Sequence, residues 1–215
     1  MEMPLARIVS HPKNKAVRIL LLDDSRADAD LIARELERSE IEVILERVDS
    51  EASFTAAVDT FAPDVVLSDH ALAQFNSRTA LETLRAISPA TAFIIMTGGQ
   101  LASITSASIR AGADDVVVKT HLGGLAASIS HALDVRRPLG ALSTRQVEVL
   151  KLVAEGYRTR DIANRLGLRV KTVESHRYAL MKRLRVDSVV GLVRFAIRVG
   201  LIPLDPGSSE RMSSA

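Results

Sequence analysis

The sequence contains no cysteine among its 215 residues, and only 3% of its residues are aromatic. The lack of cysteine excludes disulfide bonds and thiolate metal sites, and it is compatible with the reducing cytoplasm, where we expect the protein to act. No apolar run approaches the roughly 20 residues that a membrane-spanning helix needs, so we expect no membrane partner. Scarce aromatic side chains also argue against binding single-stranded nucleic acid by base stacking.

Motifs of nucleotide-binding enzymes are missing as well. Neither G-x-x-x-x-G-K-[ST] nor G-x-G-x-x-G follows the first predicted strand, which disfavours a nucleotide-binding fold or a stand-alone phosphatase. The five histidines show no spacing typical of metal ligands. Residues 1–16 form an N-terminal extension without the apolar stretch of a signal peptide. We therefore do not expect an enzyme that acts on a separate substrate.

The net charge of +2 conceals a division of the chain into an acidic and a basic part. Residues 1–138 carry 14 Lys and Arg against 19 Asp and Glu, a net charge of −5. Residues 139–202 carry 13 against 5, a net charge of +8. This contrast predicts two modules, of which the second faces a polyanion.

Short apolar runs alternate with helix-like segments as far as residue 135. The runs expected to form strands span residues 17–24, 41–48, 64–69, 92–98 and 115–119. Three of them are rich in Val, Ile and Leu and do not alternate with polar residues, as expected for strands buried on both faces. Five strands that alternate with five helices predict an α/β fold, a (βα)5 doubly wound parallel sheet, over residues 17–135.

The rest of the chain has no strand signal. Residues 136–142 contain a proline and a glycine and are predicted to form a short linker. Residues 143–202 are predicted to form an all-α domain of four helices, the first opening at Ser143 with a glutamine in capping-box spacing. Residues 203–215, rich in Pro, Gly and Ser, are predicted to be a disordered tail.

Polar side chains stand at the carboxyl ends of four predicted strands. They are Asp23 and Asp24, Asp69, Thr97 and Lys119. Each has a simple structural interpretation, as a helix start, a turn residue, a strand end or a solvated charge. However, ligands of open parallel sheets bind outside the carboxyl ends of the strands, and all five residues should converge there. Their convergence favours a functional site.

The three carboxylates of this set define its chemistry. Close carboxylates repel one another, and Mg²⁺ relieves the repulsion because it prefers oxygen ligands and tolerates one or two carboxylates plus a phosphate. A carboxylate oxygen of Asp69 can then attack a phosphoryl group. Lys119 can neutralise phosphoryl oxygens, and the Thr97 hydroxyl can donate to one. The pattern predicts Mg²⁺-assisted phosphoryl transfer to Asp69.

Four segments that carry these residues, RILLLDDSRAD, DVVLSD, FIIMTGG and AGADDVVVK, resemble the receiver domain of bacterial two-component response regulators. The resemblance covers residues 17–135. It implies that Asp69 is the phosphoacceptor, Thr97 the switch hydroxyl and Lys119 the phosphate-pairing lysine. It also implies the ligands of Mg²⁺, which are Asp23, Asp24, Asp69 and the backbone carbonyl of Ala71.

The same resemblance implies a cognate sensor histidine kinase, which would dock on the first helix near Ala27, Asp28 and Leu31. Three positions depart from the family. Ala73 stands where the family usually has proline, Ser77 where it usually has glycine, and Val116 where it usually has an aromatic residue that follows the switch threonine. These departures keep open an alternative in which the receiver acts as a dimerisation or partner-docking domain independent of phosphorylation.

The third helix of the basic segment is amphipathic. At 100° per residue, Val173, Leu180 and Leu184 fall on one stripe that must face the core. The opposite face is polar and contains few acids; it carries Ser175, Tyr178 and Lys182, flanked by Glu174. A polar, weakly acidic face on a basic module is typical of a helix that enters the major groove of double-stranded DNA.

Residues 141–202, and above all DIANRLG followed by KTVESHR, resemble the helix-turn-helix domain of the LuxR/FixJ/NarL class. The resemblance implies that Glu174, Ser175 and Tyr178 face bases. It implies backbone contacts from Thr159, Arg160, Lys171, Thr172 and Arg177. Thr159 replaces the usual Asn but can still cap its helix.

Together the two resemblances describe a FixJ/NarL-type response regulator. We expect a transcription factor in which phosphorylation of Asp69 controls dimerisation and DNA binding. Two bound modules would read half-sites about one turn of DNA apart.

Overall fold

The computed structural model describes residues 16–72, 75–99 and 101–202. For residues 101–104 it describes the backbone alone. The chain divides into two units, and the main division falls after Arg137. The predicted N-terminal extension and C-terminal tail lie outside the described residues, apart from residue 16. Within the described residues, no helix is both long and apolar enough to cross a bilayer.

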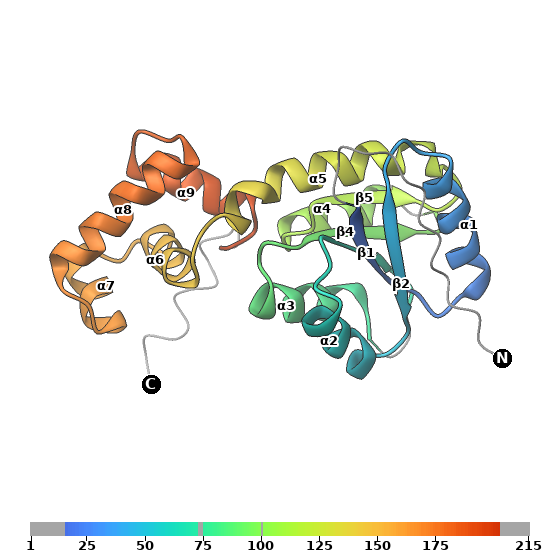
Figure 1. Cartoon of the computed structure of the whole chain (residues 1–215), viewed down its shortest axis with the longest axis horizontal. Coiled ribbons are helices and arrows are strands. Elements are labelled where there is room, and N and C mark those ends of the chain that lie inside the picture. The colour runs from blue at the N-terminus through green and yellow to red at the C-terminus, as the bar shows by residue number, and fades with distance from the viewer. Residues whose placement is uncertain (1–15, 73–74, 100, 203–215) are drawn as a thin grey trace. The chain divides into compact units, whose positions relative to one another are not determined.

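The first unit is built on a five-stranded parallel sheet in the order β2-β1-β3-β4-β5 (Figure 1). The strands are β1 (Val17–Leu22), β2 (Val43–Val48), β3 (Val65–Asp69), β4 (Ala92–Thr97) and β5 (Asp115–Val118). The interior strands β3 and β4 are buried along their whole length, which explains their apolar runs. The predicted α/β class is confirmed.

Helices cover both faces of this sheet. They are α1 (Arg26–Glu37), α2 (Glu51–Thr60), α3 (Ser77–Ile87), α4 (Leu101–Arg110) and α5 (Leu125–Gly140), the last preceded by a 3-10 turn, η1 (Leu122–Gly124). Successive side chains of a strand point to opposite faces. Ile19 and Leu21 of β1 therefore pack with α1 and α5, whereas Leu20 and Leu22 pack with α2 and α3.

The second unit is helical, as predicted. Its helices are α6 (Thr144–Ala154), α7 (Thr159–Leu166), α8 (Val170–Leu184) and α9 (Val189–Arg198). The Ser143 hydroxyl accepts from the N–H of Gln146, and the Gln146 side chain accepts from the N–H of Ser143, which completes the predicted capping box. The buried side chains of α8 include Val173 and Leu180 of the predicted stripe, whereas Leu184 is half-buried.

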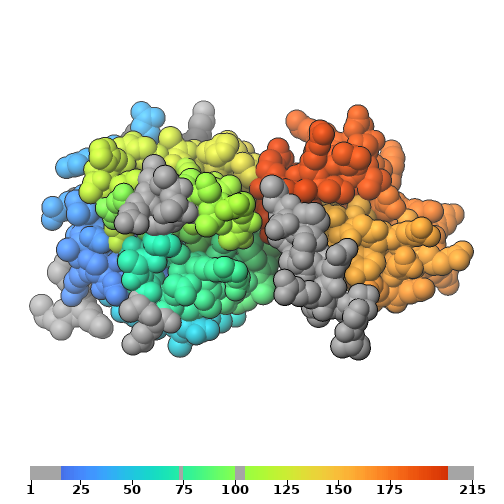
Figure 2. All heavy atoms as spheres, turned by 180° about the vertical axis from the view of Figure 1, so that it is seen from behind, coloured from blue at the N-terminus to red at the C-terminus, as the bar shows by residue number. Residues whose placement is uncertain are grey.

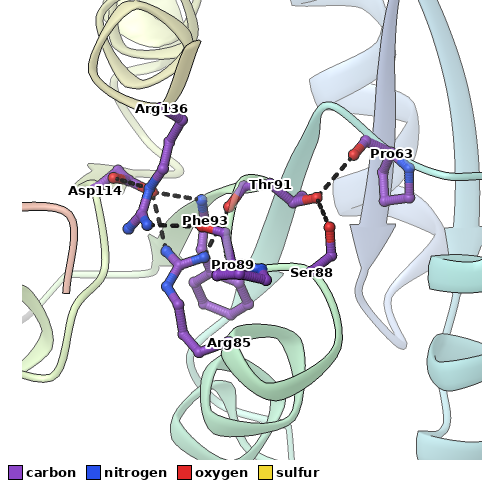
Figure 3. A network of polar contacts seen from close by, with 8 residues as sticks. All are labelled: Pro63, Arg85, Ser88, Pro89, Thr91, Phe93, Asp114 and Arg136. Carbon is purple, nitrogen blue, oxygen red and sulfur yellow. Dashed lines mark hydrogen bonds and ion pairs between the residues drawn. The ribbon is translucent and has the colours of Figure 1, made fainter. Parts of the chain in front are cut away.

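The segment predicted as a linker, 136–142, is instead largely helical, because α5 continues through Gly140 with Pro138 inside it. Arg136 explains this continuation. Its side chain is only 2% exposed, and its Nε donates to Asp114 Oδ1 at 2.8 Å. Its Nη1 donates to the carbonyl of Pro89 at 3.0 Å (Figure 3). These tertiary contacts hold the last turn of α5 in place despite the proline.

Asp114 forms a buried ion cluster with Arg136 and Arg85, here called the Asp114 cluster (Figure 3). Arg85 Nη2 donates to Asp114 Oδ2 at 3.2 Å, and Arg85 Nη1 donates to the carbonyl of Thr91 at 2.7 Å. The N–H of Phe93 also donates to Asp114, at 2.8 Å. Burial lowers the pKa of both arginines, and the Asp114 carboxylate opposes this effect. The cluster joins α3, β4 and α5 near the amino ends of β4 and β5.

Candidate functional site

Three carboxylates meet at the carboxyl edge of the sheet. Asp23 and Asp24 follow β1, and Asp69 ends the neighbouring strand β3, so the strand order alone brings them together. Each offers an oxygen that lies within 4.8 Å of the other two. Asp23 and Asp69 are buried, whereas Asp24 is exposed. A cluster of hard oxygen donors with one side open to solvent fits the requirements of Mg²⁺, which retains several waters when bound.

Lys119, which directly follows β5, places its ammonium group among these acids. Its Nζ lies 2.9 Å from Asp23 Oδ2, 3.0 Å from Asp69 Oδ1 and 2.6 Å from Asp28 Oδ2. Burial alone would lower the pKa of Lys119, but the hydrogen bonds to the three carboxylates outweigh it and raise that pKa above its ordinary value. Lys119 is therefore fully charged at neutral pH. The four acids and Lys119 are called the acidic rim below.

The backbone of Asp23 is fixed from two sides. Its N–H donates to the carbonyl of Val48 at 3.1 Å, and its own carbonyl accepts from Arg47 Nη1 at 2.8 Å. The N–H of Ser25 donates to Asp23 Oδ1 at 2.8 Å. Burial raises the pKa of Asp23, although its hydrogen bonds with Lys119 and Ser25 oppose the rise. A cation at the rim would offset the burial of this carboxylate.

The remaining predicted residues of this site lie at the same edge. Thr97 ends β4 in a buried position, and its carbonyl accepts from the N–H of Lys119 at 2.8 Å. Ala71 lies in the turn after β3. Ser77 is buried at the start of α3, where its Oγ lies 3.3 Å from His70 Nδ1. Val116 is half-buried and packs against the core that α2 and α3 cover.

Sequence reasoning missed the contact of Asp28 with Lys119. Asp28 was expected on the kinase-facing surface together with Ala27 and Leu31, and these two are indeed exposed, Leu31 to 55%. Asp28 instead turns its carboxylate toward β5. The only signal in the sequence was the S-x-x-D spacing from Ser25, which predicts a helix cap rather than an ion pair. Ala73 lies outside the described residues.

The outer side of α8 is the second candidate surface (Figure 2, orange). Six predicted DNA contacts are exposed, with Tyr178 exposed to 68%. These exposed residues are Arg160, Lys171, Glu174, Ser175, Tyr178 and Lys182. The Ser175 hydroxyl donates to the carbonyl of Lys171 at 3.0 Å within the helix. Thr159, Thr172 and Arg177 are half-buried.

Arg177 links α8 to α7. Its Nη1 donates to Thr159 Oγ1 at 2.6 Å. The cap of α7 is Arg158, without a side-chain hydrogen bond, so the expectation that Thr159 caps the helix is wrong. Thr159 is the first helical residue, and its hydroxyl accepts a hydrogen bond from Arg177 of the neighbouring helix α8 instead. The contact fixes α8 relative to α7.

The chain resembles known families in both units. A family model described as "Response regulator receiver domain" matches residues 19–129, which is more than half of the chain. The chain belongs to the response regulators. A second model, described as "Bacterial regulatory proteins, luxR family", matches residues 140–196 of this response regulator. The two models confirm the predicted resemblance to the FixJ/NarL type.

Individual relatives match this response regulator over shorter stretches. It is 45% identical over 60 residues to the "Uncharacterized response regulatory protein YgeK" of Escherichia coli K12, a match that covers 28% of this chain and 41% of the relative. It is 37% identical over 90 residues to the "Oxygen regulatory protein NreC" of Staphylococcus haemolyticus, covering 41% of this chain and 42% of the relative. The matches thus span less than half of these curated relatives.

Among solved structures, full-length FixJ from B. japonicum is similar at a TM-score of 0.49 and 20% identity. The match covers 88% of this chain and all of FixJ.

Proposed function

We propose that this response regulator is a transcription factor whose receiver accepts a phosphoryl group on Asp69 from a sensor histidine kinase. The observation that carries the proposal is the contact of Lys119 Nζ with Asp69 Oδ1 at 3.0 Å, beside two further carboxylates whose oxygens lie within 4.8 Å of one another and of Asp69. One group can attack phosphorus, one can neutralise the transferred oxygens, and the others can hold a cation.

The transfer step uses the residues in distinct roles. A carboxylate oxygen of Asp69 forms a bond to phosphorus while the bond from phosphorus to the donor histidine nitrogen breaks, and its electron pair stays on that nitrogen. Lys119 neutralises charge on the phosphoryl oxygens, and the Thr97 hydroxyl donates to one of them. Asp23, Asp24, Asp69 and the Ala71 carbonyl would hold Mg²⁺, which would supply positive charge near the transferred oxygens.

The output step uses the outer side of α8. We assign base contacts to Glu174, Ser175 and Tyr178, which are exposed. Exposed Lys171 and Arg160 suit phosphates, as does Lys182. The net charge of +8 on residues 139–202 favours double-stranded DNA as the partner. Phosphorylation adds about −1.5 to −2 charges at the rim and thereby favours a receiver state that forms a homodimer on DNA half-sites.

A modification experiment tests the receiver. The full chain is incubated with Mg²⁺ and acetyl phosphate, and intact mass, oligomer size and affinity for genomic DNA fragments are measured. Wild type gains one phosphoryl group, and Asp69→Asn gains none. The matched control Asp59→Asn, an exposed acid of α2, keeps the adduct. Absence of an adduct on wild type, or an adduct that leaves oligomer and affinity unchanged, contradicts phosphorylation control.

The half-buried Val116 favours a second function. A valine packed against the core lacks the ring that could follow the Thr97 hydroxyl. A receiver that docks a partner without phosphorylation would need no such ring. In that case wild type and Asp69→Asn would show the same oligomer size and the same DNA affinity, with or without acetyl phosphate.

A binding experiment tests the output surface. Lys171→Ala should weaken binding to all DNA sequences and lower the salt slope by about one phosphate contact. Tyr178→Ala should change which fragments are preferred. The control is Lys151→Ala, which removes an equal charge from an exposed position on α6. Equal loss on every fragment for Tyr178→Ala would contradict its role at bases.

A further inference from the structure

Asp28 makes the shortest contact of the acidic rim. It lies in the first turn of α1, three residues after the N-cap Ser25, and its Oδ2 is 2.6 Å from Lys119 Nζ. Its side chain is 34% exposed, whereas the side chain of Asp23 is fully buried. Asp28 is therefore the acid of the Lys119 contact that is best able to move.

An open capping box directs Asp28 to Lys119. In α2 and α6 the side chain of the third helical residue accepts from the N–H of the N-cap residue, as Ser53 and Gln146 do. In α1 the N-cap Ser25 donates its N–H to Asp23 Oδ1 instead. The Ser25 hydroxyl still accepts from the N–H of Asp28. This hydrogen bond stabilises the first turn of α1. The Asp28 carboxylate is not used in the cap and contacts Lys119, which follows β5.

The ammonium group of Lys119 has three N–H donors, and three carboxylates surround it. A phosphoryl group on Asp69 needs donors from this same nitrogen. Asp69 and Asp28 both contact Nζ, so they are close neighbours, and an anion built on Asp69 is repelled by the Asp28 carboxylate. Asp28 therefore opposes the phosphorylated state in two ways: it competes for the N–H donors of Lys119, and its charge repels the phosphoryl group.

We propose that Asp28 is a positioning residue that withholds Lys119 from the phosphoryl group on Asp69 and limits how strongly the receiver holds that group. The inference rests on the proposed function of Asp69. It distinguishes Asp28 from Asp23 and Asp24, because loss of Asp28 strengthens the binding of an anion at the rim. Loss of a cation ligand would instead weaken the rim for cation and phosphoryl group together.

Calorimetric titration of the full chain tests the proposal with two ligands, Mg²⁺ alone and beryllofluoride at fixed Mg²⁺. Asp28→Asn should bind beryllofluoride roughly threefold to tenfold more tightly, because one negative charge and one competitor for Lys119 are gone. It should bind Mg²⁺ equally or more weakly, because the rim has lost negative charge. A merely structural role would shift both affinities in the same direction, toward weaker binding.

Two variants separate contact from charge. Asp28→Glu keeps the carboxylate and should keep the affinity of wild type for beryllofluoride. Asp30→Asn removes the same charge from an exposed position on the same helix, and its affinity should also stay at the wild-type value. Thermal unfolding of each variant verifies that it is folded at the titration temperature.

Three results would overturn the inference. They are unchanged or weaker beryllofluoride binding by Asp28→Asn, tighter binding by Asp30→Asn to the same extent, or tighter binding of both ligands by Asp28→Asn. Failure of the proposed function looks different. In that case wild type itself binds no beryllofluoride and is indistinguishable from Asp69→Asn, which removes the competition on which the role of Asp28 depends.

Discussion

The receiver contains two clusters of charge, at opposite ends of the same parallel sheet. The Asp114 cluster near the amino ends joins one acid to two arginines, and backbone groups add hydrogen bonds to it: Asp114 accepts from the N–H of Phe93, and both arginines donate to carbonyls. The acidic rim at the carboxyl ends joins four acids to one lysine. One cluster is closed and buried, and the other has excess negative charge and faces solvent at Asp24.

This difference separates a structural charge cluster from a functional one. The Asp114 cluster leaves little room for a ligand, because its carboxylate and both guanidinium groups are buried and contact one another and nearby backbone groups. An open cluster with unbalanced charge is costly until a cation or a phosphoryl group completes it. Burial of charge therefore does not identify a site by itself. Several carboxylates crowded together within reach of solvent do.

The largest predicted effect belongs to the closed cluster. Asp114→Ala leaves two buried arginines without their carboxylate and should lower the free energy of unfolding by about 3–5 kcal/mol. Urea denaturation of the full chain measures this loss. Asp69→Ala should cost far less, because Lys119 keeps two other carboxylates and repulsion among the acids is relieved. Equal losses at the two positions would erase the distinction between the clusters.

The next effect belongs to the open rim. Mg²⁺ should stabilise the wild-type chain by about 2.7 kcal/mol at one hundred times its dissociation constant, because it binds the folded rim. Asp24→Asn should lose most of this gain. Denaturation with and without Mg²⁺ measures it. The same gain should persist in a folded variant of the other cluster, such as Arg85→Lys. Stabilisation by Mg²⁺ that survives Asp24→Asn would place the cation elsewhere.

A smaller effect concerns the lysine of the rim. Lys119→Ala removes the positive charge beside the cation position and frees its three carboxylate partners. Mg²⁺ should bind this variant roughly threefold to tenfold more tightly. Calorimetric titration measures the change, with Lys151→Ala as the control that removes an exposed lysine of the other unit. Weaker Mg²⁺ binding would show that Lys119 holds the acids in the geometry that the cation needs.

The smallest effect is expected at an exposed ion pair of α5 that flanks Arg136. Asp134 pairs with Arg137 at 3.1 Å, but both side chains are more than two thirds exposed. Asp134→Ala should change the free energy of unfolding by less than about 1 kcal/mol. Urea denaturation of Asp134→Ala, measured together with that of Asp114→Ala, gives this change. A loss as large as that at Asp114 would mean that burial does not set the cost.

The sequence predicts the rim better than the closed cluster, for a physical reason. Asp23, Asp69 and Lys119 each end an apolar run, and the carboxyl ends of parallel strands meet at one edge, so position in the run predicts position in space. The strands and helices follow from the same periodicity.

Asp114 and its arginines carry no such signal. Arg85 lies in a helix and Arg136 at the end of another, where polar residues usually face solvent, and no spacing connects residues that are 22 or 29 positions apart. Asp28 is similar, because its spacing from Ser25 predicts a cap, and only the diversion of the Ser25 N–H to Asp23 redirects it. The helical conformation of residues 136–140 had no local signal for the same reason, since Pro138 favours a break and the contact of Arg136 is tertiary.

The anchoring of Arg136 also decides where the receiver can be cut. The family model ends at residue 129, and apolar periodicity ends at residue 135. A fragment that stopped at either position would keep Asp114 in the interior and discard one of the two guanidinium groups that neutralise it. An isolated receiver should therefore extend at least through Gly140, the last residue of α5. The folding unit of the receiver is therefore expected to be longer than the stretch that the family model matches.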